Sequence, residues 1–120
     1  IYFNATGNLA TTSYTWTDIS TFTQSIVVPA GQTWEIYCIA HMTGYNSAGT
    51  DEFGIRCVIG TNNGVGGNAG MAVNVRQTVV DSLMISSGAA TITAKAQYYS
   101  GAQTILGCAR SFTIIISKVA

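Results

Sequence analysis

The sequence predicts a single all-β domain, an antiparallel β-sandwich of the jelly-roll type that spans residues 1–120. Isoleucine and valine together number 22 and leucine numbers 3; β-branched side chains favour strands, whereas leucine favours helices. Apolar and polar residues alternate in several segments, which is the period of a half-buried strand. No segment shows an apolar repeat of 3.6 residues between helix caps. A chain of 120 residues fits one domain.

The clearest alternation lies in residues 34–42, where every second residue from Trp34 onward is apolar and is expected to face the core. Residues 53–59 and 91–98 alternate in the same way. Residues 112–119 contain three consecutive isoleucines, which indicates cover on both faces. The expected strands, in chain order, are residues 1–4, 13–19, 22–28, 34–42, 53–59, 71–80, 91–98 and 112–119.

Turn signals separate these strands. Residues 29–32 read Pro-Ala-Gly-Gln, a turn in which proline presets φ. Residues 44–50 form a polar loop. Residues 62–64 read Asn-Asn-Gly, a turn that residues 64–70 extend into a flexible loop. Seven or eight short strands at a spacing of roughly ten residues are typical of a sandwich or jelly roll.

Composition limits the partners of the chain. Charged residues make up 8%, and five basic residues cancel five acidic ones. Phosphate contacts need clustered lysine and arginine, so nucleic acid is excluded as a partner. The sequence has no run of about 18 apolar residues, so we expect no membrane insertion. It has no basic segment followed by an apolar stretch, so it predicts no signal peptide. Starting at Ile1 rather than Met indicates a processed protein or a fragment of a longer one. The uncharged surface, rich in threonine and serine, favours a virion surface or another extracellular location.

The three cysteines, Cys38, Cys57 and Cys108, all lie in apolar strand-like segments. Their spacing matches no zinc motif. One interpretation is three buried thiols that pack as small apolar side chains. The other is one disulfide and one free thiol, and the sequence leaves both open.

The candidate chemical motifs favour a protein that is not an enzyme and that needs no cofactor or metal. Residues 64–69 loosely match a dinucleotide fingerprint, but residues 71–80 read as a strand where that fingerprint requires a helix. His41 is the only histidine, and no nucleophile elbow is present. Asp51 and Glu52 are adjacent carboxylates in a polar loop before a strand. Glycosidases need two carboxyl groups across a cleft, whereas neighbours on a strand point to opposite faces. We therefore expect a solvated loop here and no catalytic pair.

Aromatic residues are the more informative group, because on a neutral surface they stack on sugar rings or pack in subunit interfaces. Ten of them lie mostly in strands or at strand ends, and some must belong to the core: Tyr2, Phe3, Tyr14, Trp16, Phe22, Trp34, Tyr37, Tyr45, Tyr98 and Tyr99. Tyr37 and Ile39, together with His41, lie opposite the core-facing side of residues 34–42. We expect these three residues in an interface between subunits.

The order of the segments resembles a known group of proteins. A start that ends in Tyr-Thr-Trp-Thr-Asp-Ile (residues 14–19) leads to Val-Val-Pro-Ala-Gly (residues 27–31), and the chain ends with Tyr-Tyr-Ser-Gly (residues 98–101) and a last strand, residues 112–119. This pattern resembles the head domains of phage tail fibres and related virion proteins, which look like the tumour-necrosis-factor/C1q jelly roll.

The resemblance implies a trimer that attaches to a host receptor or glycan through loops at one end. By position these loops are residues 44–50, 61–70 and 100–104. The residues in them that we expect to bind a ligand are Tyr45, Asn46, Asn62, Asn63 and Asn68.

The leading hypothesis is therefore a virion structural domain without catalytic activity, a trimeric fibre or spike head that contacts a host receptor or glycan. The alternative is a self-assembling extracellular filament, pilus-like or coat subunit. In that hypothesis residues 1–16, a strand-exchange or stalk-proximal segment, donate a β-strand to a neighbour. A secreted enzyme or lectin of sandwich fold is the third hypothesis, and no paired carboxylates across a cleft support it.

Overall fold

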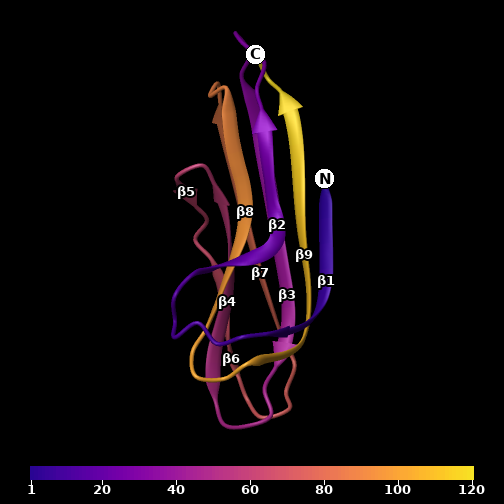
Figure 1. Ribbon diagram of the computed structural model, residues 1–120, viewed down its shortest axis with the longest axis vertical. Coiled ribbons are helices and arrows are strands. Elements are labelled where there is room, and N and C mark those ends of the chain that lie inside the picture. Colours follow the sequence, from indigo (N-terminus) through magenta and orange to yellow (C-terminus); the bar gives the residue numbers. More distant parts are fainter.

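The computed structural model describes residues 1–120, which form nine strands joined by loops and no helix (Figure 1). The molecule is elongated, with extents of 53 × 21 × 18 Å. The strands are β1 (Tyr2–Leu9), β2 (Thr17–Val27), β3 (Trp34–Tyr45), β4 (Asp51–Ile59), β5 (Asn62–Asn63), β6 (Gly67–Met71), β7 (Gln77–Ser87), β8 (Thr91–Ser100) and β9 (Ile105–Lys118).

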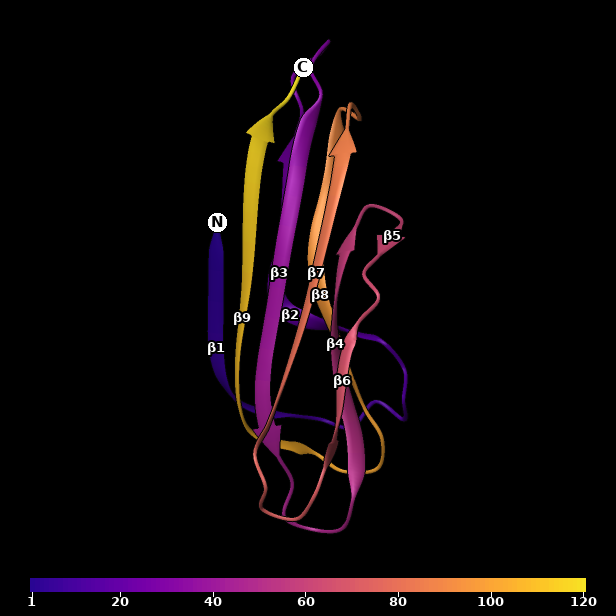
Figure 2. The ribbon, with the colours of Figure 1, turned by 180° about the vertical axis from the view of Figure 1, so that it is seen from behind.

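The strands form two antiparallel sheets that pack face to face. The first sheet has the order β1-β9-β3-β7, and the second has the order β2-β8-β4-β5, with β6 also paired to β4. From β1 to β4, and again from β6 to β9, the chain changes sheet at every connection (Figures 1 and 2). This alternation gives a jelly-roll strand order. The predicted all-β, single-domain antiparallel sandwich is confirmed.

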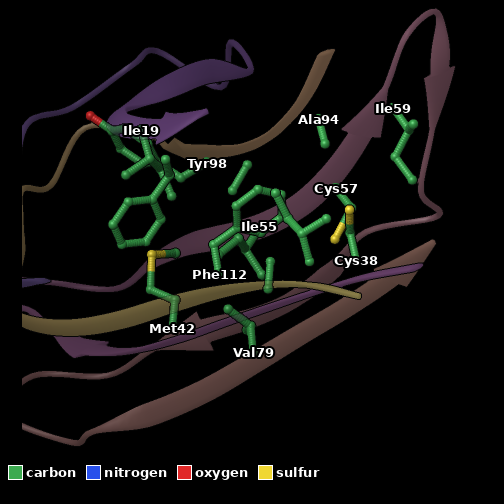
Figure 3. Close-up of a cluster of buried hydrophobic side chains, with 14 of the residues drawn as sticks. Ile19, Cys38, Met42, Ile55, Cys57, Ile59, Val79, Ala94, Tyr98 and Phe112 are labelled. Carbon is green, nitrogen blue, oxygen red and sulfur yellow. The ribbon is translucent and has the colours of Figure 1, made fainter. Parts of the chain in front are cut away.

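The core lies between the sheets and follows the predicted alternation. In β3 the inward residues Ile36, Cys38, Ala40 and Met42 are fully buried. The second sheet contributes inward residues of β4 and β8, and Figure 3 shows side chains from both sheets meeting, among them Ile55 and Phe112. The alternate residues of β3 face outward and are half-buried, as a two-layer sandwich requires.

All three cysteines are buried and free. This agrees with the interpretation of thiols packed as small apolar groups. No disulfide is formed, although Cys38 and Cys57, which come from opposite sheets, lie close together in the core (Figure 3).

The prediction of one continuous strand over residues 71–80 is wrong. β6 ends at Met71 and β7 begins at Gln77, and Asn74 between them has a left-handed φ of 57°. The physical reason is that β6 pairs with β4 in one sheet and β7 pairs with β3 in the other. The chain must therefore leave one layer and enter the other between these strands.

Other boundaries also differ from the prediction. The turn expected at residues 62–64 is made instead by Gly60 and Thr61. Asn62 and Asn63 already belong to strand β5, where they pair with Ile59 and Val58. The supposed flexible loop after it contains strand β6. The first strand continues to Leu9 along β9, beyond the predicted residues 1–4.

Candidate functional site

An aromatic patch, defined as Tyr14, Trp16 and Tyr99, lies on the outer face of the second sheet. Tyr99 comes from β8, and its ring centroid lies 4.7 Å from that of Trp16 in an edge-to-face arrangement and 6.3 Å from that of Tyr14. Gly54 of β4 is paired with Tyr99, and a Cβ at Gly54 would collide with the Tyr99 ring. The missing side chain lets the ring lie across β4.

Tyr14 lies in a strained turn that precedes β2 in the sequence. Ser13 and Tyr14 have φ values of 52° and 62°, a left-handed conformation that costs about 1–2 kcal/mol for a residue with a side chain. The turn is anchored on Ser100, whose carbonyl accepts hydrogen bonds from the backbone N–H of Tyr14 at 2.9 Å and of Thr12 at 3.2 Å. The Tyr14 side chain nevertheless remains 61% exposed. An exposed ring is thus presented on a fixed backbone.

Two carboxylates fix the tyrosine hydroxyls of the patch. Tyr14 donates to Oδ1 of Asp51 at 2.9 Å, and Tyr99 donates a short hydrogen bond to Glu52. The hydrogen bond to Asp51 raises the pKa of Tyr14. Burial, with the Glu52 hydrogen bond, raises the pKa of Tyr99 to about 12. Asn68 of β6 also donates to Glu52 at 3.1 Å.

Asp51 connects the patch to the loop between β8 and β9. Its Oδ2 accepts from the backbone N–H of Gln103 at 2.8 Å, and its Oδ1 also accepts from the N–H of Glu52 at 2.8 Å. Burial raises the pKa of Asp51, but these N–H groups and the Tyr14 hydroxyl outweigh it, so the pKa is lowered. The expectation that Asp51 is only a solvated loop residue is therefore wrong.

A basic side chain lies over the Trp16 ring. The Arg56 guanidinium carbon lies 4.5 Å from the Trp16 ring centroid. Arg56 donates to Gln97 at 2.8 Å, and Gln97 donates to Asp18 at 2.8 Å. This chain of bonds keeps the Trp16 ring in one orientation.

A separate polar cavity of about 400 Å³ lies where the loops β3–β4 and β8–β9 meet, at the lower end of Figure 1. It is lined by amides and hydroxyls and by two apolar residues, with no charged side chain. The lining residues are Asn8, Asn46, Ser47, Ala102, Gln103, Thr104 and Leu106.

The structure separates the predicted ligand-binding residues. Asn68 borders the aromatic patch, and Asn46 lines the end cavity. Tyr45 does not line the cavity, because it faces the outer side of the first sheet. There the Arg76 guanidinium carbon lies 5.1 Å from the centroid of the Tyr45 ring. Asn62 and Asn63 form the short edge strand β5, which pairs with Ile59 and Val58 of β4, whereas Asn68 pairs with Gly54.

The expectation of three loops at one end is correct for residues 44–50 and 100–104 only. Residues 61–70 run back along the edge of β4, where Asn63 pairs with Val58 and Met71 pairs with Asp51. Pairing along the edge spreads this segment over the length of the sheet. It therefore cannot gather at the end as a loop.

The predicted interface residues Tyr37, Ile39 and His41 lie together on the outer face of the first sheet. Tyr37 pairs with Met84 of β7 and with Ile115 of β9, which are 57% and 50% exposed. An exposed apolar row thus crosses the sheet at this position. It lies on the opposite side of the sandwich from the aromatic patch.

Sequence reasoning named the aromatic residues but did not single out the patch. Its members come from sequence positions more than 80 residues apart, and Asp51 and Glu52 read as solvated neighbours. The available signal was the pair of aromatic residues before β2 together with the tyrosine pair that ends β8. Nowhere do three histidine, cysteine or acidic side chains gather closely enough to hold a metal ion. The structure contains no helix long and apolar enough to cross a membrane.

Comparison with known proteins identifies no family. No protein-family model matches the chain, and no curated protein sequence does. Among solved structures, the insecticidal delta-endotoxin Cry8Ea1 of Bacillus thuringiensis aligns at a TM-score of 0.38 and 15% identity, over 96% of this chain and 19% of that one. A CBM4 structure aligns at a TM-score of 0.31 and 9% identity, over 81% of this chain and 59% of that one.

The chain therefore spans less than two thirds of either structure. Neither is a phage fibre head or a TNF/C1q domain, so that resemblance stays a hypothesis. Alignments at these TM-scores say nothing about the function of this chain.

Proposed function

We propose that this chain is a binding domain without catalytic activity, located on a virion surface or elsewhere outside the cell, that contacts a neutral receptor glycan through the aromatic patch. The observation that carries the proposal is Tyr14. Its ring is 61% exposed, sits on a strained backbone and has its hydroxyl fixed to Asp51. Strain kept at an exposed residue is a feature of binding and catalytic sites.

The chemistry of the patch suits a sugar ring. The apolar C–H face of a sugar packs on an aromatic face, and its hydroxyls need acceptors around the rim. The second carboxylate oxygen of Glu52 and the amide oxygen of Asn68 supply that rim. Asp51 and Glu52 outnumber Arg56, the cation that lies over Trp16, so like-charge repulsion disfavours an acidic ligand. A neutral glycan is therefore preferred over a sialylated or sulfated one.

The same contacts support a role without catalysis. Both oxygens of Asp51 accept hydrogen bonds that hold loops in place, from Tyr14 and Glu52 on one oxygen and from Gln103 on the other. A general base needs a free acceptor near the substrate. His41 lies on the outer face of the other sheet, so it does not share a site with these carboxylates.

For assembly we propose a homotrimer, a fibre or spike head, joined through the outer face of β3. The exposed row Met84–Tyr37–Ile115 and the neighbouring Ile39 and His41 offer an apolar surface without a charge cluster, which suits contact between copies. Several copies of the patch would raise a weak affinity through avidity.

The alternative assembly is a filament in which residues 1–16 pair with a neighbour. In the single chain β1 pairs with β9 from Tyr2 to Leu9, and the amino group of Ile1 donates to the Ile114 carbonyl at 3.0 Å. A filament would place the same strand on β9 of the next subunit. The edge position of β1 makes such an exchange feasible.

A glycan array tests the proposed ligand. The protein is displayed as a multivalent fusion beside Tyr14→Gly and beside Tyr2→Ala, which removes an equally exposed tyrosine from the other sheet. We expect neutral glycans to bind the wild type and the Tyr2 variant and not the Tyr14 variant. Selective binding of sialylated glycans, or equal binding by the Tyr14 variant, would contradict the proposal. Light scattering after size exclusion gives the number of copies.

A further inference from the structure

Asn63 and Gly64, where the edge strand β5 ends, form the one Asn-Gly pair in the chain. The other six asparagines are followed by residues that carry a side chain. In an Asn-Gly pair the glycine nitrogen can attack the side-chain amide carbon of the asparagine, because no Cβ blocks the close approach. Asn63 is exposed, so water reaches its amide. The pair therefore has the chemistry of a spontaneous deamidation site.

The fold requires glycine at position 64. A Cβ at Gly64 would lie 2.0 Å from Oδ2 of Asp81. The Asp81 side chain is buried, and its carboxylate accepts from the N–H of Cys57 at 2.8 Å and of Gly66 at 3.1 Å. Moving it aside would leave both N–H groups without their acceptor. The labile pair is thus a consequence of how Asp81 joins the two sheets.

In the folded domain the attacking nitrogen is engaged. The Gly64 N–H donates to the carbonyl of the buried Cys57 at 2.8 Å. Asn63 pairs with Val58 of β4, which keeps its backbone extended, whereas ring closure requires the backbone to turn. The Asp81 carboxylate beside Gly64 opposes loss of the N–H proton, because the nitrogen becomes negative as it attacks. Three contacts therefore hold the pair unreactive.

We propose that Asn63 is a deamidation site that the fold keeps closed and that reacts when β5 leaves β4. The Gly64 nitrogen bonds to the Asn63 side-chain carbon and gives its proton to solvent, while the amide nitrogen takes up a proton and leaves as ammonia. Water then opens the cyclic imide at either carbonyl, which gives aspartate or isoaspartate. Strand β5 has only two residues and lies at the sheet edge (Figures 1 and 2), and such segments open before the whole domain unfolds.

The product changes this edge permanently. Either acid adds a negative charge at position 63, and isoaspartate also lengthens the main chain by one carbon. The residues that follow then lose their register with β4. The segment 64–67 should therefore loosen, including Gly66, whose Cα lies against the Trp16 ring. Each molecule that has opened and reacted keeps a chemical record of the opening.

The test compares wild type in buffer with wild type in urea at the same mildly alkaline pH. Trypsin, which cleaves after arginine, then releases residues 57–76 as one peptide. This peptide holds four asparagines, Asn62, Asn63, Asn68 and Asn74. Mass spectrometry locates the acid, so the other three serve as internal controls. We expect Asn63 to react first in urea, and at least about tenfold more slowly in the folded protein.

Variants separate the chemistry from the closure. In urea, where folding does not matter, Gly64→Ala should slow the reaction several-fold. In buffer, Asp81→Ala should speed it several-fold, whereas Asp18→Ala, which removes a surface carboxylate, should react as wild type. Unreactive thiols at Cys38 and Cys108 show that a variant is still folded. Asp81→Asn, which keeps the shape of the side chain and loses one acceptor, is the second variant if Asp81→Ala unfolds.

Three results would overturn the proposal. Equal rates for folded and urea-denatured wild type would show that the fold does not close the site. Equal modification of all four asparagines in urea would show that Asn63 is not a preferred site. An unchanged rate in the folded Asp81 variant would show that this carboxylate does not hold the pair.

Discussion

The Tyr14 hydroxyl and the Asp51 carboxylate, 37 positions apart in the sequence, are joined by a hydrogen bond of 2.9 Å. The same carboxylate accepts from the backbone N–H of Gln103 at 2.8 Å. One acidic residue therefore sets both the exposed ring of the patch and a wall of the end cavity. The two regions should respond together when Asp51 is changed.

Replacing Tyr14 separates binding from stability. Tyr14→Gly removes the ring, but glycine adopts the left-handed φ of 62° without strain. The strain released offsets the lost hydrogen bond and the greater freedom of the unfolded chain. We expect the free energy of unfolding to change by less than about 1 kcal/mol, measured by urea denaturation. Tyr14→Ala keeps the strain and should be the less stable variant. A large loss in Tyr14→Gly would mean that the ring serves the fold.

Acid should loosen the region around Asp51. Its pKa in the folded protein is lowered from 3.8, so its stabilising effect is complete above the unfolded value and is lost as pH falls through the lower folded value. We expect faster hydrogen exchange at the Gln103 amide below about pH 4, after correction for the intrinsic rate. Asp51→Asn should lose this pH dependence. Equal profiles for the two proteins would assign the effect to another carboxyl group.

Asp81 ties the two sheets together through a buried carboxylate. From β7 it accepts from the N–H of Cys57 in β4 at 2.8 Å and from the N–H of Gly66 at 3.1 Å. Asp81→Ala leaves two N–H groups unpaired and should cost about 2–5 kcal/mol in denaturant unfolding. Asp18→Ala is the control, because its carboxylate pairs with Lys95 at the surface and should cost less than about 1 kcal/mol. A similar cost for both variants would contradict this role of Asp81.

The thiols should be unreactive in the folded protein. Burial raises the pKa of Cys38 to about 12 and also raises the pKa of Cys57 and of Cys108. A thiolate is the reactive form, so we expect no labelling by a disulfide reagent at pH 8 under native conditions. Three thiols per chain should react in denaturant. Only one reactive thiol after unfolding would show a disulfide in the folded protein.

Much of the fold could be predicted because the alternation of residues 34–42 is a local property, and β3 buries the face that the pattern indicates. The crossing at residues 72–76 could not, because periodicity does not record which sheet a strand joins. Gly67 shows the same limit. It reads as part of a flexible loop, yet a Cβ there would collide with the backbone of Val80.

The candidate site was predicted only in part, for the same reason. Asn46 and Asn68 were found because they lie in polar stretches of the sequence. The patch depends on contacts between segments distant in sequence and on left-handed backbone at Ser13 and Tyr14. Residues other than glycine and asparagine seldom adopt that conformation, so no sequence signal indicated it.

The most direct test of the central claim uses the fluorescence of Trp16. The chain has two tryptophans, and Trp34 begins β3, in the first sheet, away from the patch. In a Trp34→Phe background, titration with the neutral oligosaccharides that bind on the array should give a saturable change in emission. Tyr14→Gly in the same background should remove it. Glycan binding that leaves Trp16 emission unchanged, or saturation that survives Tyr14→Gly, would contradict the aromatic patch as the binding site.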